Sequence, residues 1–503
     1  MAAPVNLHLK NIVTNAMQKA KIEDEFGEYF VPKDHKNRLV GYTQLEQIFL
    51  GDHIAAFNPN LPDGAMYIPE LFGQLISFTS ADLLFGLEPV SITSTDEVGT
   101  EFVDTFREAN RDFDTRLFEA ALSNSYFGDI VVELKLVDDK PEVIFHDPRN
   151  WVFKLNPDGT FRQHELCFMV KDVSGELYLH KRIHQKGLII NELWKVTNRD
   201  KTKKTFDEGN LTRATFADIG MDVQDEEPTG VDDFLVKQIP NMRLLNGVAG
   251  LSDYVGKKQL MNALNMLTSF ATYVLEKNSD PAMEVPEGTL NADSEVYRED
   301  FRVFQTNAQT KGIPRYITWD GGLTSLFEQR THVIEMLALY SEISLGLLGK
   351  ETGGPMPEAY RTARLKYMRT LMKMARKQRY WTEGLLWVME TSQKLTGVKD
   401  SSVSDFNIQF SDGLPNDTVE ELEGRMLERD LKIKSNETIV RETLSQQGWT
   451  QEQIEDELEK IRLEKSANTP PNMSTAPVNI FERSTEVTQP EDGEQGQAGN
   501  SGS

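Results

Sequence analysis

The chain has 503 residues and a formal net charge of −25 at pH 7; 39% of its residues are hydrophobic and 26% are charged. This length predicts two to four compact units rather than a single domain. The one cysteine, Cys167, excludes an intramolecular disulfide. The N-terminal residues lack the apolar run of a signal peptide, and the uncharged stretch 259–275 is too polar and too short for a membrane span. We therefore expect a protein that does not enter a membrane and is cytosolic or assembled in a cytosol.

The N-terminal part of the chain contains two strong helical patterns. Apolar residues at helical spacing predict one helix over 69–86 and another that begins behind Ser94 or Thr95 and runs through 103–124. The side of the first helix expected to face the core comprises Leu71, Leu75, Phe78, Leu83 and Leu84.

A region rich in strand signals follows. Alternating patterns over 129–196 predict antiparallel strands, with a turn at 156–159 that has the sequence Asn-Pro-Asp-Gly. Residues 214–236 then carry seven carboxylates and no basic residue. Such a run of like charges is typical of a solvated loop.

From residue 251 onward the sequence changes to long helical patterns. Apolar residues in alternating steps of three and four indicate a packed seam on the first of these helices: Leu260, Leu264, Leu267, Ala271 and Val274. No charged residue lies between Lys258 and Glu276. This favours a helix covered on nearly every side, either by a deep core or by neighbouring copies of the chain.

Prolines interrupt the next segment, 280–322, and indicate a small mixed insertion. A second helical pattern follows it and places Glu328, Glu335 and Glu342 seven residues apart on one face. The two long helices with the insertion between them predict an antiparallel stalk with a small head.

Residues 361–379 carry eight basic side chains and no acid. They follow a glycine-rich stretch, 346–358, within a helix predicted from about 357 to 394, which would be ~57 Å long. A cationic helix on an acidic chain needs an anionic partner, on its own surface, on a neighbouring subunit or on nucleic acid. One side is expected to pack against protein, and the other to meet the carboxylates of an adjacent copy, with contact to DNA as the alternative. The packing side is Leu365, Met368, Met372 and Ala375, and the charged side is Lys366, Arg369, Lys373 and Arg376.

The C-terminal residues divide into two parts. Residues 417–465 read as acidic helices with a break at Gly448. Residues 467–503 have scarcely any apolar content and are expected to be disordered.

The sequence contains no recognisable catalytic constellation. The phrase GLLGKET lacks the phosphate-binding loop pattern, because Ser344 stands where a glycine is needed and Glu351 where Ser or Thr is needed. His180 and His184 fall on a predicted strand, where four residues span ~13 Å, and no further ligands complete a metal site. We therefore expect that the protein is not an enzyme, has no catalytic residue and binds neither a metal nor a cofactor.

The order of several local phrases, over nearly the whole chain, resembles that of tailed-bacteriophage portal proteins, in the family of the Gram-positive siphophage portals. These phrases are LFGQLISFTSADLLFGLEPVSI at 71–92, the helix, glycine and sheet at 118–155, GLSDYVGKKQLMNALNML and its continuation at 250–288, GGPMPEAYRTARLKYMRTL and its continuation at 353–385, and the helices at 435–465.

The resemblance implies an α+β portal fold that forms rings. Its parts would be a wing at 1–250, a two-helix stem at 251–277 and 323–345, a clip at 278–322, a tunnel loop at 346–357, a long helix with a return to the wing at 358–416, a crown at 417–466 and a disordered acidic tail at 467–503.

The resemblance also implies a function. About twelve copies would form a ring at the unique capsid vertex of a virion, as a conduit through which double-stranded DNA is packaged and later ejected. The clip would dock the terminase large subunit and then a head-completion or adaptor protein, and the ring would also contact major capsid and scaffolding proteins.

The resemblance and the charge pattern together imply roles for three groups of residues. Those expected to face DNA from the tunnel loop are Leu347, Leu348, Lys350, Glu351 and Thr352. For Leu347 and Leu348, packing of the loops of neighbouring copies on each other around the bore is the alternative. The channel-lining candidates are Glu328, Glu335 and Glu342, for which pairing with Lys257 or Lys258 of another subunit, or simple solvation, is the alternative. The basic helix would pair between subunits through Arg364, Lys366, Arg369, Lys373 and Arg376.

An acidic channel wall would repel the phosphate backbone and so suit a conduit. The rival function is a DNA-binding protein or enzyme that uses 361–379 as a phosphate-contact surface.

Overall fold

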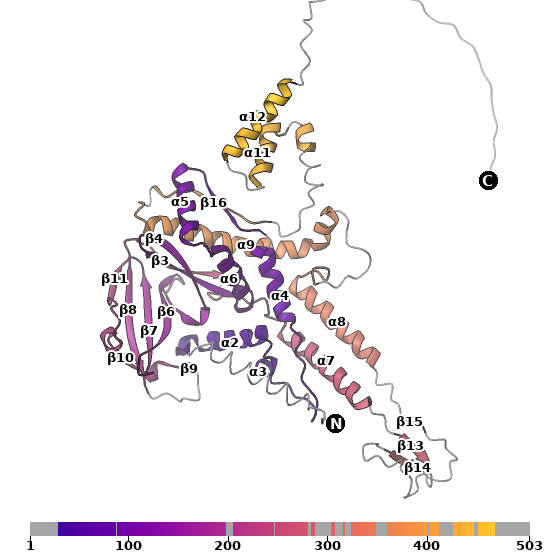
Figure 1. Cartoon of the computed structure of the whole chain (residues 1–503). Coiled ribbons are helices and arrows are strands. Elements are labelled where there is room, and N and C mark those ends of the chain that lie inside the picture. The colour runs from indigo at the N-terminus through magenta and orange to yellow at the C-terminus, as the bar shows by residue number, and fades with distance from the viewer. Residues whose placement is uncertain are drawn as a thin grey trace, which may run out of the picture. The chain divides into compact units, whose positions relative to one another are not determined.

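The computed structural model of this chain (Figure 1) divides into two compact units, residues 1–416 and 417–503. The residues that it describes are 29–86, 88–197, 205–245, 247–279, 283–286, 303–306, 315–316, 323–348, 360–399, 402–411, 426–431, 433–446 and 451–467.

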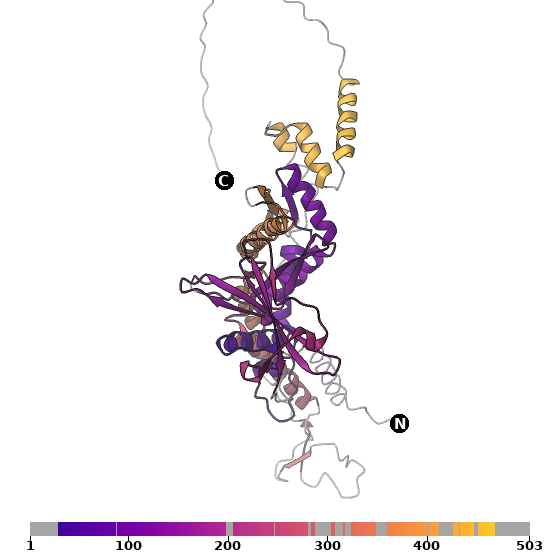
Figure 2. The same cartoon turned by 90° about the vertical axis from the view of Figure 1, so that its left-hand side faces the viewer.

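The largest sheet confirms the predicted run of antiparallel strands (Figures 1 and 2). It contains β5 (Trp151–Leu155), β6 (Phe161–Lys171), β7 (Leu177–Gln185), β8 (Leu188–Val196) and β10 (Leu211–Ala214), in the order β10-β8-β7-β6-β5. The predicted turn at 156–159 is present, with Gly159 at a φ of 84° and the Asn156 amide donating to the Thr160 carbonyl over 2.8 Å. The acidic segment is not solvated loop throughout, because β11 (Glu226–Pro228) pairs with β8.

A second sheet has the order β12-β3-β4, from Val236–Pro240, Asp129–Val137 and Lys140–His146. The turn between β3 and β4 consists of Asp138 and Asp139, both at positive φ, which matches the twist of a two-residue hairpin. Two smaller pairings join distant segments, β1 (Tyr29–Phe30) with β9 (Thr205–Phe206) and β2 (Ser91–Ser94) with β16 (Phe406–Gln409).

The helix predicted through 103–124 is two helices, α5 (Glu97–Ala109) and α6 (Phe113–Phe127). Asn110 lies at the break. Its side-chain amide donates to the Phe106 carbonyl at the end of α5 and to the Pro141 carbonyl on β4. An asparagine that satisfies these two buried carbonyls ends the helix where the spacing of apolar residues indicates continuation.

The predicted buried side of the helix at 69–86 is wrong in part. The segment forms α4 (Phe72–Ala81) and a π-helical turn (Asp82–Gly86), and Leu71, Leu75 and Phe78 are exposed. The buried side is made largely of small residues, including Ser77 and Ser80. Gly73 explains why, because a Cβ there would lie 3.1 Å from Ile48 and 3.2 Å from the Tyr254 ring, so this side meets its neighbours closely. Other helices packed near α4 are α2 (Lys36–Leu50) and α3 (His53–Phe57).

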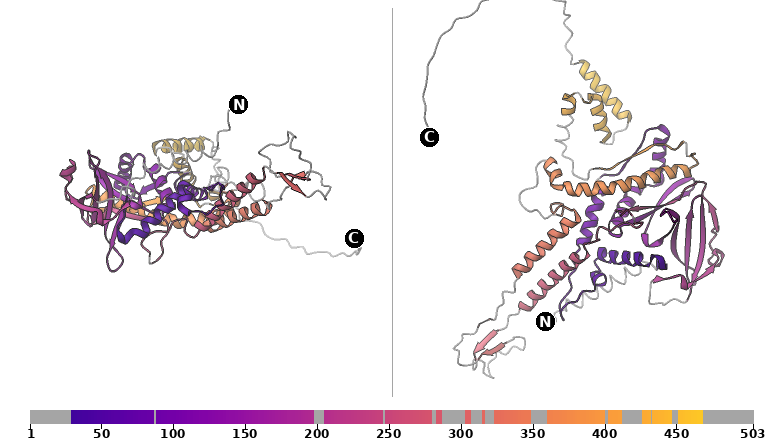
Figure 3. Two further views of the ribbon diagram at one scale, coloured as in Figure 1. Left: turned by 90° about the horizontal axis from the view of Figure 1, so that it is seen from below. Right: turned by 180° about the vertical axis from the view of Figure 1, so that it is seen from behind.

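The two long helices predicted after residue 251 are α7 (Lys258–Asn278) and α8 (Leu323–Ser341), which lie side by side and antiparallel (Figures 1 and 3). Of the predicted seam on α7, Leu264 and Ala271 are buried, while much of the rest of the helix is only half-buried. Between the two helices the chain forms a three-stranded sheet of β13 (Met283–Pro286), β14 (Val303–Thr306) and β15 (Arg315–Tyr316).

The long basic helix is α9 (Tyr360–Leu395), whose 36 residues span about 54 Å. In the second unit, α11 (Asn436–Gln446) and α12 (Gln451–Ala467) are joined by an ion pair between Arg462 and Glu437 at 2.9 Å. The predicted break at Gly448 lies outside the described residues, as does the predicted tail at 467–503 apart from Ala467, which is the last residue of α12. No helix in the described ranges is both long enough and apolar enough to cross a bilayer.

Candidate functional site

The C-terminal half of α9 fixes which side of the whole helix is buried. There Trp381, Leu385 and Val388 belong to the largest apolar core, together with side chains from β3, β4 and the π-helical turn. Because α9 is one continuous helix, the same stripe extends toward its N-terminus in steps of three and four. The residues that it buries there are Tyr367, Thr370, Met374 and Lys377.

Within the single chain, the buried side of the basic segment is therefore not the side expected to pack against protein, and packing of that side against another copy stays a prediction. On the side expected to pack, Leu365 is 73% exposed, Met368 48% and Met372 50%, and Ala375 is exposed as well. The side that does pack contains two lysines, Lys373 and Lys377, which are 7% and 4% exposed.

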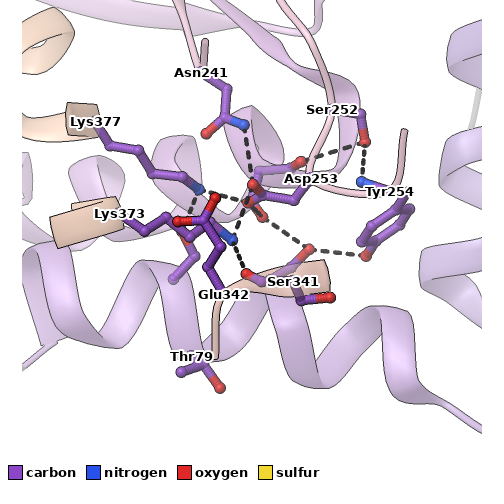
Figure 4. Close-up of polar contacts among 12 residues, drawn as sticks. Thr79, Asn241, Ser252, Asp253, Tyr254, Ser341, Glu342, Lys373 and Lys377 are labelled. Carbon is purple, nitrogen blue, oxygen red and sulfur yellow. Dashed lines mark hydrogen bonds and ion pairs between the residues drawn. The ribbon is translucent and has the colours of Figure 1, made fainter. Parts of the chain in front are cut away.

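Both lysines bind one buried carboxylate, that of Asp253, in the loop before α7 (Figure 4). The Lys373 ammonium lies 3.1 Å from Asp253 Oδ1, and Lys377 donates to Oδ2. The Ser125 hydroxyl on α6 also donates to Oδ2 over 2.6 Å. These contacts join α6, the start of α7 and α9 at a single point, and this point is buried because Asp253 is only 7% exposed.

The remaining contacts of the two lysines extend this junction to α8 and α4. Lys373 donates to the Ser341 carbonyl at the end of α8 over 3.1 Å, and Lys377 donates to the Ser80 hydroxyl on α4. In the same network the Tyr254 and Ser77 hydroxyls lie 2.8 Å apart. The described partners of Lys373 thus belong to its own chain, whereas the sequence predicts pairing with an adjacent copy.

Burial and charge act against each other on the pKa values of this group. Burial by itself would raise the pKa of Asp253, but Lys373 and Lys377 outweigh it and hold that pKa well below its usual range. Burial lowers the pKa of Lys377 to about 8, although Asp253 acts in the opposite direction. One carboxylate shared by two ammonium groups leaves a buried excess of positive charge.

Glu342 does not continue the face of α8 on which the sequence predicts it. The helix ends at Ser341, and Glu342 has a φ of 56° in the left-handed region. Its amide donates to the Leu339 carbonyl and the Ile343 amide to the Ala338 carbonyl, the pattern of a Schellman helix end. From this position its carboxylate pairs with Arg376 on α9.

Glu328 and Glu335 remain on α8, and both are exposed. They share one face with Thr331 and His332, and they line the same shallow hollow. Two of the three predicted channel-lining residues therefore keep the predicted arrangement relative to each other. Their exposure toward a channel stays a prediction.

The residues predicted to touch DNA are only partly within the described structure. Leu347 and Leu348 are half-buried and pack against the apolar cores of this chain. Lys350, Glu351 and Thr352 lie outside the described residues, as does the side chain of Arg364. Lys366 and Arg369 are exposed on α9.

The two histidines of β7 form no metal site. His180 lies 3.2 Å from the side-chain oxygen of Asn191, and His184 lies 3.4 Å from the buried carboxylate of Glu133. Arg182 pairs with the same carboxylate. No group of three or more potential metal ligands is found within the described ranges.

Sequence reasoning missed Asp253. A signal existed in the spacing of Lys373 and Lys377, which are four residues apart and continue the apolar stripe of Trp381 and Leu385. Two lysines on the buried side of a helix require a carboxylate, because a buried charge is stable only when it is paired. The sequence alone could not tell which of the 79 acidic residues supplies it.

Comparison with known proteins gives matches among solved structures only. No family model matches this chain, and no curated protein matches it. A chain from the virion of a native gene transfer agent (GTA) particle is similar, with a TM-score of 0.45 and 11% identity over 79% of this chain and 91% of that chain. A chain from the neck of the empty GTA particle, computed with C6 symmetry, has a TM-score of 0.42 and 12% identity over 73% and 86%. One from the neck of the native particle, computed with C12 symmetry, has a TM-score of 0.44 and 11% identity over 82% and 93%.

Proposed function

We propose that this chain is a portal protein. About twelve copies form a ring at the unique vertex of a phage-like capsid, and double-stranded DNA passes through the ring during packaging and ejection. The terminase large subunit and later a head-completion or adaptor protein bind at residues 278–322. The role is structural and requires no catalysis.

The order of the parts along the chain is the observation that carries this proposal. An α+β region comes first, followed by α7, a small three-stranded sheet and the antiparallel α8. The segment 346–357 follows, and the long helix α9 then returns to the first region through β16, which pairs with β2. This is the order of wing, stem, clip, tunnel loop and long helix that the resemblance of the sequence to portal proteins implies.

Exposed apolar side chains on α9 support assembly into a ring. Leu365, Met368 and Met372 follow one another at helical spacing, and each is about half exposed or more. A contiguous apolar stripe on a protein surface is typical of a contact with another protein. We propose that an adjacent copy covers it, and that Lys366 and Arg369 beside it pair with carboxylates of that copy.

The chemistry of the basic helix argues against the rival function, a DNA-binding protein or enzyme. Lys373 and Lys377 are buried and bound to Asp253, so neither can reach the phosphates of a duplex. In our proposal DNA is approached instead by the tunnel loop, and Glu328 and Glu335 contribute negative charge to the channel wall, which limits adhesion of the phosphate backbone.

Electron microscopy of the purified full-length chain in negative stain tests the proposal. Rings of about twelve subunits with a hollow axis are expected, together with weak duplex binding that shows no sequence preference. Discrete monomers that bind duplex DNA tightly, with an affinity that falls steeply as salt increases, would instead support the rival function.

A further inference from the structure

A cavity of 130 Å³ lies beside the Asp253 junction. Its walls come from the loop after β12, the loop before α7, the end of α8 and one side of α9. Among the described residues, four basic side chains line it, Lys257, Lys373, Arg376 and Lys377, and two carboxylates, those of Asp253 and Glu342. The cavity therefore has an excess of about two positive charges at neutral pH.

Hydrogen-bond donors remain available around this cavity. An ammonium group has three N–H donors. Within the described residues, Lys373 uses them on Asp253 and the Ser341 carbonyl, and Lys377 on Asp253 and Ser80, so each lysine keeps one donor.

Two residues that line the cavity also carry a buried polar atom without a partner within the described ranges. The Ser341 hydroxyl, in a residue that is 1% exposed, and the side-chain oxygen of Asn241, in a residue that is 3% exposed, have no hydrogen-bond partner in the described part of the chain. Buried polar groups of a folded protein are nearly always satisfied, by the protein or by something bound to it. The hydroxyl can donate to an anion, and the Asn241 oxygen can accept from a protonated one or from water.

We propose that this cavity binds a small, doubly charged oxyanion of the phosphate class. Such an ion would neutralise the charge excess and accept hydrogen bonds from Lys373, Arg376 and the Ser341 hydroxyl. The volume admits a phosphate group, and the low exposure of Lys373 and Lys377 excludes the backbone of a duplex. Burial lowers the pKa of Lys257, and repulsion from Lys373 lowers it further, which is the situation that a bound anion relieves.

The cavity lies between two helices, so a bound ion would affect how they are held together. Ser341 ends α8, and Arg376 lies on α9, so one ion would bridge the two helices that flank residues 349–359. Binding would stabilise this arrangement by mass action. The inference rests on the cavity alone and does not require that the chain form a ring.

Isothermal titration calorimetry of the full-length chain with inorganic phosphate tests the proposal, in a buffer without other polyvalent anions and with chloride at constant ionic strength. We expect one saturable site per chain with a dissociation constant of about 1 mM or below. Without a specific site, phosphate is excluded from the protein surface and would give no saturation. A parallel titration with adenosine monophosphate distinguishes a site for the free phosphate ion from a site for the phosphate group of a monoester. Binding of phosphate alone identifies the free ion, and binding of both identifies a phosphate monoester. Binding of neither overturns the proposal.

Two variants with opposite expected effects separate a ligand site from a merely structural cluster. Arg376→Gln removes a donor and should weaken phosphate binding about tenfold or more, the loss of one charge-assisted hydrogen bond. Glu342→Gln removes the carboxylate that competes for Arg376 and should strengthen binding. Arg379→Gln is the matched control, because Arg379 is exposed on the same helix and does not line the cavity.

Equal affinities in all three variants would contradict the proposal, as would weaker binding in Glu342→Gln. Sedimentation and circular dichroism of each variant establish that it keeps the assembly state and helix content of the parent chain. Ser341→Ala supplies a second test through an uncharged change, and it should weaken binding without affecting the ion pairs.

Discussion

Asp253 holds together three segments that are far apart in the sequence, α6, the loop before α7 and α9, and it does so with one carboxylate for two buried ammonium groups. Removing one partner of a buried ion pair leaves an uncompensated charge, which costs about 3–5 kcal/mol. We predict that Asp253→Asn lowers the free energy of unfolding by this amount in urea denaturation. Asp104→Asn, at an exposed position on α5, is the control and should change it by about 0.5 kcal/mol or less. Equal effects of the two changes would show that the junction is unimportant for stability.

The depressed pKa of Asp253 also predicts a pH dependence. A carboxyl group whose pKa is lower in the folded than in the unfolded chain stabilises the fold above the unfolded value of about 4, and this contribution is lost as the pH falls below it. The difference in unfolding free energy between the parent chain and Asp253→Asn should therefore be constant between about pH 5 and pH 7 and shrink below pH 4. Urea titrations across this range measure it. A difference that grows toward acid would contradict the assignment.

At the scale of elements, the end of α8 is held by a residue that is unusual for its conformation. Glycine is the common residue in the left-handed position of a Schellman helix end, and any other residue costs about 1 kcal/mol there. Glu342 occupies it and pairs with Arg376. We predict that Glu342→Gly is more stable than Glu342→Ala by about 1 kcal/mol, as measured by thermal or urea unfolding. Both variants lose the ion pair, so their difference isolates the backbone, and equal stability would contradict the assigned conformation.

Two helices show why the spacing of apolar residues identified helices better than it identified their buried sides. On α4 the large side chains Leu75 and Phe78 are exposed, while the buried side includes Gly73, whose close neighbours leave no space for a larger side chain at that position. On α9 the side is fixed by Trp381 and the apolar residues that follow it, so Lys373 is buried and Met372 is not. In both cases the whole surroundings of the helix determine its rotation, and a local window of sequence does not contain them.

At the scale of the whole molecule, the exposed stripe on α9 predicts how assembly can be blocked. Met372→Glu places a charge where we propose that an adjacent copy packs, and it should abolish rings while the chain keeps its helix content and urea midpoint. Val173→Glu is the control, since Val173 is fully exposed in the turn between β6 and β7. Sedimentation velocity and negative-stain images measure the outcome. Rings of normal size in Met372→Glu would mean that this stripe is not a subunit contact.

The sequence by itself determined the antiparallel strands from 129 to 196, the turn at Gly159, the two long helices and the extent of α9. These features depend on contacts between near neighbours, on glycine conformation and on helical periodicity, all of which are local. Only the tertiary structure decided the break at Asn110, the position of Glu342 beyond α8 and the burial of Lys373 and Lys377 against Asp253. Each depends on a partner more than thirty residues away, and the free energy of such a contact is set by which segments the fold brings together. The sequence thus determines the high charge of the basic helix, and the fold determines which of its cations are buried.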